Sequence, residues 1–184
     1  AVLPADEVAR AATDLLLLAV PDDALRGVVA GLARTGALPS GQMVAHTSGA
    51  HGLDVLGDVR GMALHPAMTF TGEPADLDRL PGIAWGVTAH DRAFATRLVA
   101  DLGGVREPVA EEARPLYHAA LAHGANHLVT LVNEARDRLR DAGVRHPERV
   151  LRPLLQAALD NSLALGDAAL TGPVSRGDAG TVAG

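Results

Sequence analysis

Apolar runs alternate with helical patterns through the first half of the chain. The unbroken run at residues 15–20 is typical of a strand that is buried on both faces, as in parallel sheets covered by helices. It stops at residues 21–23, and a helical spacing of apolar residues follows at 22–33. Burial stabilises each leucine by about 1.5–3 kcal/mol only if neighbours cover it. Only a helix-like piece at 5–12 precedes the run, so we expect the covering strands to be missing or supplied by another chain.

Four more short strands and a helix continue this alternation, which predicts an α/β fold with a parallel sheet up to about residue 110. The strands are expected at residues 42–47, 61–65, 83–88 and 105–109, and the helix at 91–102. After these elements the apolar pattern becomes helical throughout. One long helical pattern covers 114–142 and ends at Gly143, and Pro147 opens a second helix. We therefore predict an all-α second domain over 111–184, after an α/β domain over 1–110.

Composition and charge narrow the classes of function. The chain has 184 residues, a net charge of −6 and 2% aromatic residues, so it lacks the concentrated positive charge of nucleic-acid binding. There is no cysteine, which excludes disulfides and thiolate chemistry. All sixteen basic residues are arginine, which excludes lysine acids and Schiff bases. No apolar run approaches a membrane span and no signal peptide is visible, so we expect a soluble cytoplasmic protein.

Three loops would converge at one edge of a parallel sheet, where such sheets bind ligands. The loop at residues 21–23 is either a helix cap formed by an aspartate or backbone that lies against a nucleotide. The loop at 46–49 offers hydroxyls and a flexible glycine, although an ordinary polar turn explains it equally well. The third loop places His65 at a strand end, fixed by Pro66, where it either holds a ligand or serves the structure alone.

The long helix carries polar residues three and four apart, which share one face: His123, Asn126, Thr130, Asn133 and Asp137. Small side chains surround the start of this line and would let a ligand approach, so His118, His123 and Asn126 are the better candidates. His123 and His127 stand one turn apart, but a third ligand is missing, and we predict no metal. A late turn offers Arg176 and Asp178, either for a substrate or as a structural ion pair.

Five segments of the chain carry a family resemblance: DLLLLAVPDDAL, VAHTSGAHGLDVL, MALHPAMTF, RPLYHAALAHGANHLVTLVNEA and LTGPVSRGDAGTV. Together they span nearly the whole chain. They resemble Rossmann-like bacterial proteins of the 6-phosphogluconate dehydrogenase C-terminal-like superfamily. Within it they are most similar to a family whose helical second half is known only as a domain of unknown function. Ketopantoate and pyrroline-carboxylate reductases are wider relatives.

The resemblance implies a partial Rossmann-like NAD(P)-binding domain, followed by a helical domain for substrate binding and dimerisation. The G-x-G-x-x-G turn that opens such proteins is absent, so we expect a fragment that starts after this turn and stops before the last helices. Related reductases carry a lysine proton donor one turn before an asparagine. Asn126 matches the asparagine, but Ala122 stands at the position of the lysine. A histidine would then have to donate the proton, with His118, His123 and His65 as candidates.

The resemblance thus implies an NAD(P)-dependent oxidoreductase that reduces a small 2-oxo acid, with ketopantoate as the best single substrate and a slight preference for NADP over NAD. Asn126 would bind the substrate oxygen, and Thr69, Arg176 and Asp178 would contact the rest of the substrate. A homodimer through the helical domain is expected, without nucleic-acid or membrane partners. The alternatives are a non-catalytic nucleotide-binding or regulatory dimer, and a dimerisation module. The residues expected to bind the cofactor are Val20, Pro21, Asp22, Thr47, Ser48, Gly49, His65 and Pro66.

Overall fold

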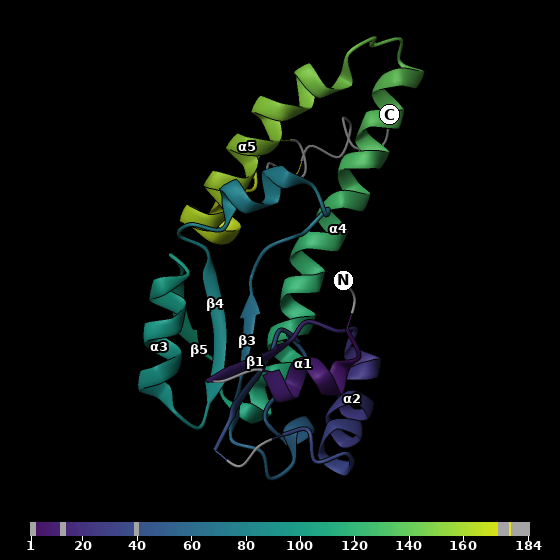
Figure 1. Cartoon of the computed structure of the whole chain (residues 1–184). Coiled ribbons are helices and arrows are strands. Elements are labelled where there is room, and N and C mark those ends of the chain that lie inside the picture. The colour runs from purple at the N-terminus through teal and green to yellow at the C-terminus, as the bar shows by residue number, and fades with distance from the viewer. Residues whose placement is uncertain (1–2, 12–13, 39–40, 173–176, 178–184) are drawn as a thin grey trace. The chain divides into compact units, whose positions relative to one another are not determined.

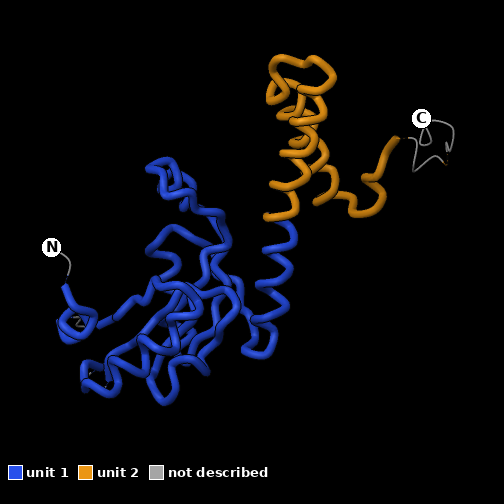
Figure 2. The backbone as a smooth tube through the Cα atoms, turned by 90° about the vertical axis from the view of Figure 1, so that its right-hand side faces the viewer, with its two compact units in different colours: residues 1–125 blue, residues 126–184 orange. Residues whose placement is uncertain are grey.

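The computed structural model describes residues 3–11, 14–38, 41–172 and 177. The chain folds as two compact units, residues 1–125 and residues 126–184, which Figure 2 shows in different colours. The division falls inside the long helix α4 (Arg114–Asp141), so the first turns of that helix belong to unit 1. The boundary between domains that we expect near Glu111 remains a prediction.

Unit 1 contains one five-stranded sheet with the order β1-β2-β3-β4-β5 (Figure 1). The first three strands are parallel, and Leu18 of β1 lies opposite His46 of β2. Their carboxyl ends therefore meet at one edge of the sheet, as the sequence predicts. The α/β class with a mostly parallel sheet is confirmed. The strands are β1 (Leu15–Leu18), β2 (Met43–His46), β3 (Gly61–Pro66), β4 (Ala84–Ala89) and β5 (Val105–Pro108).

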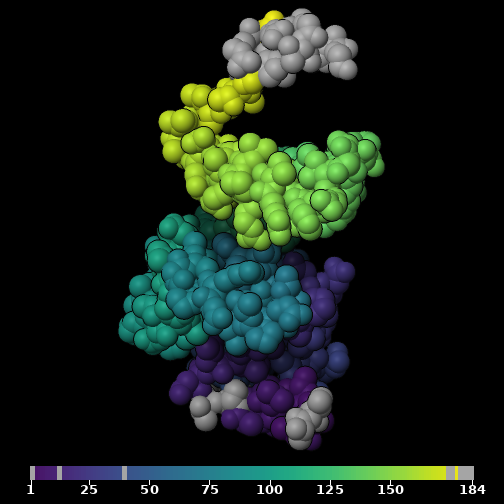
Figure 3. Space-filling view, turned by 90° about the horizontal axis from the view of Figure 1, so that it is seen from above, coloured from purple at the N-terminus to yellow at the C-terminus, as the bar shows by residue number. Residues whose placement is uncertain are grey.

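Strand β4 departs from the predicted parallel sheet, because it runs antiparallel to β3 while β5 is parallel to β4. A parallel return usually needs a helix that crosses the sheet. The segment between β3 and β4 has only the 3₁₀ helix η2 (Pro74–Arg79), which stays at the surface of unit 1 (Figure 3, blue-teal), with Leu77 68% exposed. Without a crossover helix, the chain doubles back beside β3.

Helices cover both faces of the sheet because alternate strand residues point to opposite sides. Val44 of β2 packs in a cluster with α1 (Ala5–Ala11) and α2 (Asp22–Arg34). Its neighbours Met43 and Ala45 pack instead in a second cluster with α3 (Arg92–Asp101). The apolar residues of α2 recur at helical spacing, so one face of this helix packs against the first cluster. Its residues buried there are Leu25, Val29 and Leu32.

Two expectations at the start of the sheet are wrong. Burial of β1 on both faces is not observed, since Leu16 and Leu18 are buried but Leu17 is 53% exposed. Strand β1 pairs with β2 alone among the described strands, and the helices α1 and α2 cover one of its faces. Nor does an aspartate cap α2, because the N-cap is Pro21, without a side-chain hydrogen bond. Asp22 lies inside the first turn instead, where a negative charge still favours the helix dipole.

Unit 2 contains the rest of α4, then α5 (Pro147–Leu165) and the 3₁₀ helix η4 (Gly166–Ala169). Gly143, with φ +84°, ends α4 as the sequence predicts. Among the described residues, no helix is both long and apolar enough to cross a membrane. Large apolar side chains of this unit are exposed: Leu128, Val129, Leu131, Val150, Leu154, Leu159, Leu163, Leu165 and Leu170.

Candidate active site

The carboxyl end of β3 brings His65 against the first turns of α4. The Nδ1 atom of His65 lies 2.9 Å from the hydroxyl oxygen of Tyr117. The two rings pack edge to face with centroids 5.5 Å apart, and the ring of His118 lies 6.3 Å from that of His65. Three titratable side chains, those of His65, Tyr117 and His118, therefore meet within unit 1. Together with Gly49 we call them the His65 site.

Gly49 lies so close to both imidazoles that a larger residue would displace them. A Cβ atom at this position would lie 2.7 Å from Nδ1 of His118 and 3.0 Å from the ring of His65. Nδ1 of His118 is buried and has no hydrogen-bond partner in the described part of the chain. The sequence predicts a flexible glycine here, but the structure gives another reason for it, which is the close approach of the two rings.

Arg114, the first residue of α4, is completely buried beside this site. Its Nε donates to the Thr88 hydroxyl at 2.9 Å. The two terminal nitrogens donate to main-chain carbonyls of the β2–β3 loop and of strands β3 and β4. All five guanidinium N–H groups can thus be satisfied. The carbonyl acceptors and their distances are Ser48 (3.1 Å), Gly49 (3.5 Å), Ala63 (2.9 Å) and Gly86 (3.0 Å).

The acceptors of Arg114 are all neutral, since they are four carbonyls and one hydroxyl. No carboxylate forms an ion pair with the guanidinium in the described regions. Its carbon lies 5.9 Å from the centre of the Tyr117 ring, a cation–π contact. Burial lowers the pKa of Arg114, but an arginine remains charged in proteins. A whole positive charge is therefore fixed beneath the His65 site.

His46 holds the loop that carries Ser48 and Gly49. It is completely buried, and its Nδ1 accepts a hydrogen bond from the Ser48 N–H at 3.3 Å. Because Nδ1 is an acceptor, Nε2 carries the proton and donates to the Gly52 carbonyl at 2.8 Å. Burial lowers the pKa of His46, which agrees with this neutral form. The Ser48 hydroxyl accepts in turn from the His51 N–H at 3.1 Å.

Glu111, in the 3₁₀ helix η3 (Glu111–Ala113), ties the other end of this loop to the start of α4. Its Oε1 accepts from the N–H groups of Leu53 (2.6 Å) and Asp54 (3.1 Å). These groups begin the 3₁₀ helix η1 (Asp54–Leu56), so the carboxylate acts as a helix cap that is distant in sequence. A Cβ at Gly52 would collide with this carboxylate, so the close approach requires glycine.

The surroundings keep His65 and Tyr117 uncharged at neutral pH. Burial, followed by the positive charge of Arg114 and by the electrostatic effect of the His118 ring, lowers the pKa of His65 to about 4, while Asp22 acts in the opposite direction. Burial raises the pKa of the Tyr117 hydroxyl above its usual value, although Arg114 opposes that rise. A neutral imidazole and a protonated phenol form a hydrogen-bonded pair that can pass a proton.

The structure brings together only part of the predicted site. Four of the predicted residues, Ser48, Gly49, His65 and His118, meet in the His65 site or in the loop beside it. The half-buried residues Val20, Asp22, Thr47 and Pro66 and the exposed Pro21 follow the strand ends along the same edge.

Other predicted residues lie elsewhere. Thr69 and His123 are exposed in unit 1. Asn126 is exposed in unit 2, where its main-chain carbonyl accepts a hydrogen bond from the Thr130 hydroxyl at 3.3 Å. Arg176 and Asp178 lie outside the described residues.

Sequence reasoning missed the residues that organise the site, above all Arg114 and Tyr117. A signal for both was present. Arg114, Tyr117 and His118 are three and four residues apart, so they share one helical face, and Tyr117 is the single tyrosine of the chain. His46 and Glu111 gave no comparable signal, because their partners are main-chain groups.

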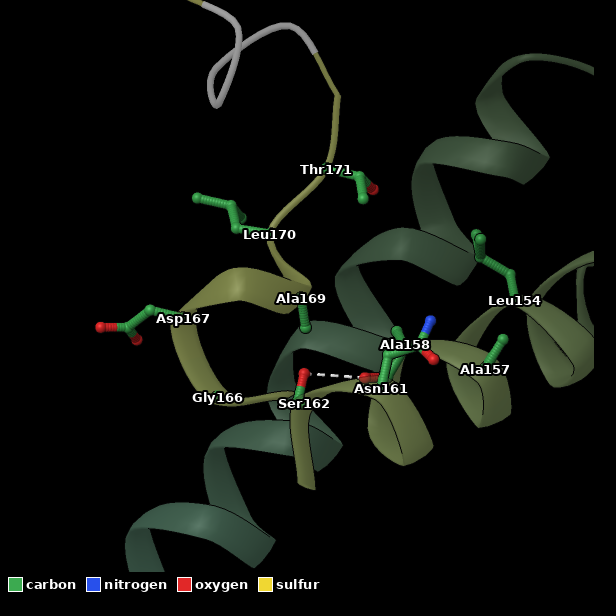
Figure 4. A pocket seen from close by; sticks show the side chains of 10 residues that line it. All are labelled: Leu154, Ala157, Ala158, Asn161, Ser162, Gly166, Asp167, Ala169, Leu170 and Thr171. Atoms are coloured by element: carbon green, nitrogen blue, oxygen red, sulfur yellow. Dashed lines mark hydrogen bonds between the residues drawn. The ribbon is translucent and has the colours of Figure 1, made fainter. Parts of the chain in front are cut away.

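A hollow of about 690 Å³ in unit 2 lacks comparable chemistry (Figure 4). Its polar side chains include Asn161, Ser162 and Asp167, and the Ser162 hydroxyl donates to the Ala158 carbonyl at 2.7 Å within the same helix. Among the described residues, no histidine, tyrosine or arginine lines it. The His65 site is therefore the better candidate for catalysis.

Comparisons with solved structures agree with this fold. The structure of the protein TM1727 from Thermotoga maritima is similar with a TM-score of 0.74 and 23% identity, over 92% of this chain and 67% of that one. The putative NADP oxidoreductase BF3122 from Bacteroides fragilis gives 0.74 and 20%, over 92% and 66%. The pyrroline carboxylate reductase from Plasmodium falciparum, with NADP bound, gives 0.67 and 13%, over 90% and 63%. The chain spans about two thirds of the length of each of these proteins.

Family models account for both halves of the chain. A Rossmann-like domain matches residues 1–68, and a domain of unknown function, DUF2520, matches residues 83–184. No curated protein is detectably similar in sequence. The predicted resemblance to Rossmann-like proteins with a helical domain of unknown function is confirmed, and the second match covers more than half of the chain. The chain belongs to the DUF2520 family, with a Rossmann-like domain before the DUF2520 domain.

Proposed function

We propose that this chain is part of an NAD(P)-dependent oxidoreductase that reduces a small 2-oxo acid, with ketopantoate as the first substrate to test. The observation that carries the proposal is the hydrogen bond between His65 and Tyr117, at the edge where the parallel strands β1–β3 end. Ligands of open α/β sheets bind at such edges. Two of the similar structures are those of a putative NADP oxidoreductase and of a pyrroline carboxylate reductase with NADP bound, which supports this class of reaction and a preference for NADP.

The loops after the three parallel strands fit a nicotinamide cofactor. The half-buried Thr47 has a hydroxyl without a side-chain hydrogen bond in the described part of the chain. The residues that would hold the cofactor are Val20, Pro21, Asp22, Thr47, Ser48, Gly49, His65 and Pro66. When bound, the reduced nicotinamide supplies a hydride. The Ser48 main chain is occupied, because its N–H donates to His46 and its carbonyl accepts from Arg114. Its hydroxyl accepts from the His51 N–H, so the O–H of Ser48 is the group left for binding.

Tyr117 supplies the proton in this proposal. The carbonyl carbon of the substrate gains the hydride, and its oxygen takes the proton from the Tyr117 hydroxyl, which yields the 2-hydroxy acid. As Nδ1 of His65 returns its proton to Tyr117 over the 2.9 Å hydrogen bond, Nε2 of the same ring takes a proton from water, so the imidazole stays neutral. The neutral state of His65 suits this relay, because one ring nitrogen of a neutral imidazole carries hydrogen and the other accepts it.

The remaining sequence candidates keep their roles as predictions. Asn126 binds the substrate oxygen, and Thr69, Arg176 and Asp178 contact the rest of the substrate. His118 and His123 are alternative proton donors, and His118 is favoured between them because it belongs to the His65 site. A homodimer through the helical domain and a cytoplasmic location complete the proposal.

Reductase activity is tested on the protein encoded by the complete reading frame. NADPH and NADH oxidation is followed by absorbance with ketopantoate and a panel of other 2-oxo acids, and cofactor binding by NADPH fluorescence. Turnover of at least one 2-oxo acid supports the proposal. Cofactor binding without turnover across the panel would replace the reductase by the alternative, a nucleotide-binding regulator.

A further inference from the structure

A buried charge normally needs a partner of opposite charge. The cost of removing an ion from water reaches several kcal/mol even after the protein relaxes. Arg114 has no carboxylate in contact within the described structure, and its five acceptors are neutral. Glu111 is the acid that acts on it through space, but the N–H groups of Leu53 and Asp54 bind that carboxylate. The charge of Arg114 therefore remains largely uncompensated.

This charge acts on the His65 site across short distances. The guanidinium carbon lies 5.9 Å from the Tyr117 ring centre, and Tyr117 is in turn bonded to His65. Arg114 also binds the Ser48 and Gly49 carbonyls. Their partially negative oxygen atoms therefore point toward the guanidinium and not toward the imidazole rings. Asp22 has the opposite effect on the pKa of His65, but this effect is smaller than that of Arg114 or of His118. The balance at this surface is positive.

We propose that the surface formed by His65, Tyr117 and His118 binds an anionic group of the carboxylate class, with the buried guanidinium of Arg114 as its fixed counter-charge. The inference rests on the proposed function and deepens it, because it places the carboxylate of the substrate at this surface. The N–H groups of Arg114 are all bound to protein acceptors, so Arg114 acts on the ligand through its charge alone. It is therefore a positioning and specificity residue. The neutral His65–Tyr117 pair supplies one hydrogen bond to the ligand, because its other hydrogen lies between the two side chains.

The chemistry of the site favours a carboxylate over a doubly charged phosphate. Phosphate sites commonly combine several cations or the free N–H groups of a helix N-terminus. Here one guanidinium is the fixed cation, and its N–H groups are occupied by protein acceptors. One positive charge and neutral donors match a group with one negative charge.

The first test compares acetate with acetamide, which have nearly the same shape but differ in charge. Each is titrated at pH 7.5 into the isotopically labelled wild-type chain, and the histidine ring signals are followed by NMR. His65→Gln and His118→Gln variants assign the two signals. We expect acetate to shift both signals to saturation with a dissociation constant at least about tenfold below that of acetamide. Equal effects of both probes, or no saturable shift with acetate, would overturn the proposal.

The second test changes the charge itself. Arg114→Met removes it, and Arg114→Lys keeps it with fewer hydrogen bonds. In the folded Met variant, acetate should bind about tenfold or more weakly, while the Lys variant should stay within about threefold of wild type. A folded Met variant with wild-type acetate affinity contradicts the proposal. If the Met variant fails to fold by circular dichroism, the wild-type comparison and the Lys variant decide. None of these measurements needs NADPH or turnover, so they can fail or succeed independently of the reductase proposal.

Discussion

His65 and Tyr117 are 52 residues apart in the chain, yet the Nδ1 atom of one lies 2.9 Å from the hydroxyl oxygen of the other. This contact joins the end of strand β3 to the first turn of α4. It gives the site a titratable pair whose two members are both neutral at pH 7. The first prediction tests whether this pair handles a proton.

Tyr117→Phe keeps the ring but removes the hydroxyl that is proposed to donate the proton. We expect kcat for NADPH-dependent reduction to fall at least about tenfold, equivalent to about 1.4 kcal/mol, with little change in KM. Leu116→Ala is the control, since Leu116 is adjacent and 75% exposed. An unchanged kcat in the Phe variant would remove Tyr117 from the mechanism.

Asn126→Ala tests the residue that the family resemblance implicates. Loss of a hydrogen bond to the substrate oxygen should lower turnover at least about tenfold. Asn133→Ala is a control of the same residue type, two turns further along α4. If Asn126→Ala keeps full turnover while Tyr117→Phe loses it, Asn126 does not bind the substrate oxygen.

Gly49→Ala should destabilise the protein and disturb both imidazoles, because the added methyl group would lie 2.7 Å from Nδ1 of His118. We expect a loss of about 1–3 kcal/mol in the free energy of unfolding, as for other overpacked positions. The matched control is Gly27→Ala in the interior of α2, where nothing lies within 4 Å of the new methyl group. That change should stabilise by about 0.5–1 kcal/mol. Urea denaturation measures both, and equal effects would refute the steric argument.

Glu111→Ala removes the carboxylate that caps η1. The N–H groups of Leu53 and Asp54 would lose their acceptor, so we expect a loss of about 1 kcal/mol in the free energy of unfolding. Glu112→Ala removes the same charge from the adjacent exposed position and serves as the control. A loss of the same size in both variants would mean that net charge, not the cap, is responsible.

The stability of the protein should fall when the pH is lowered from 6.5 to 5. The pKa of His65 is about 4 in the folded protein and near 6.5 in the unfolded chain, so the unfolded chain binds more protons between these values. The depressed pKa of His46 acts in the same direction. Urea denaturation over this range should show a shallower decline for His65→Gln than for wild type. Identical slopes would show that His65 is as accessible to protons in the folded state as in the unfolded one.

Much of the fold is predictable from local patterns. Apolar runs bounded by turn residues give all five strands within about two residues. Strand direction is different, because nothing in residues 83–88 distinguishes a parallel from an antiparallel β4; the missing crossover helix decides it. The exposure of Leu17 likewise depends on what lies beside β1, which its own sequence does not encode.

The candidate site is predictable only at its strand ends. His65 and Gly49 follow strands that the apolar pattern predicts, so their place at the sheet edge can be expected. The role of Arg114 cannot, since its acceptors lie between 26 and 66 residues away and most are carbonyls, which every residue has. The residue types alone therefore do not predict which carbonyls Arg114 binds.

The neutral acceptors of Arg114 have one more consequence. An arginine anchored by an aspartate or glutamate loses its partner when acid protonates the carboxylate. Main-chain carbonyls and the Thr88 hydroxyl do not take up protons at any pH a cell encounters. The hydrogen bonds of Arg114 between α4 and the strands are therefore kept when the pH falls.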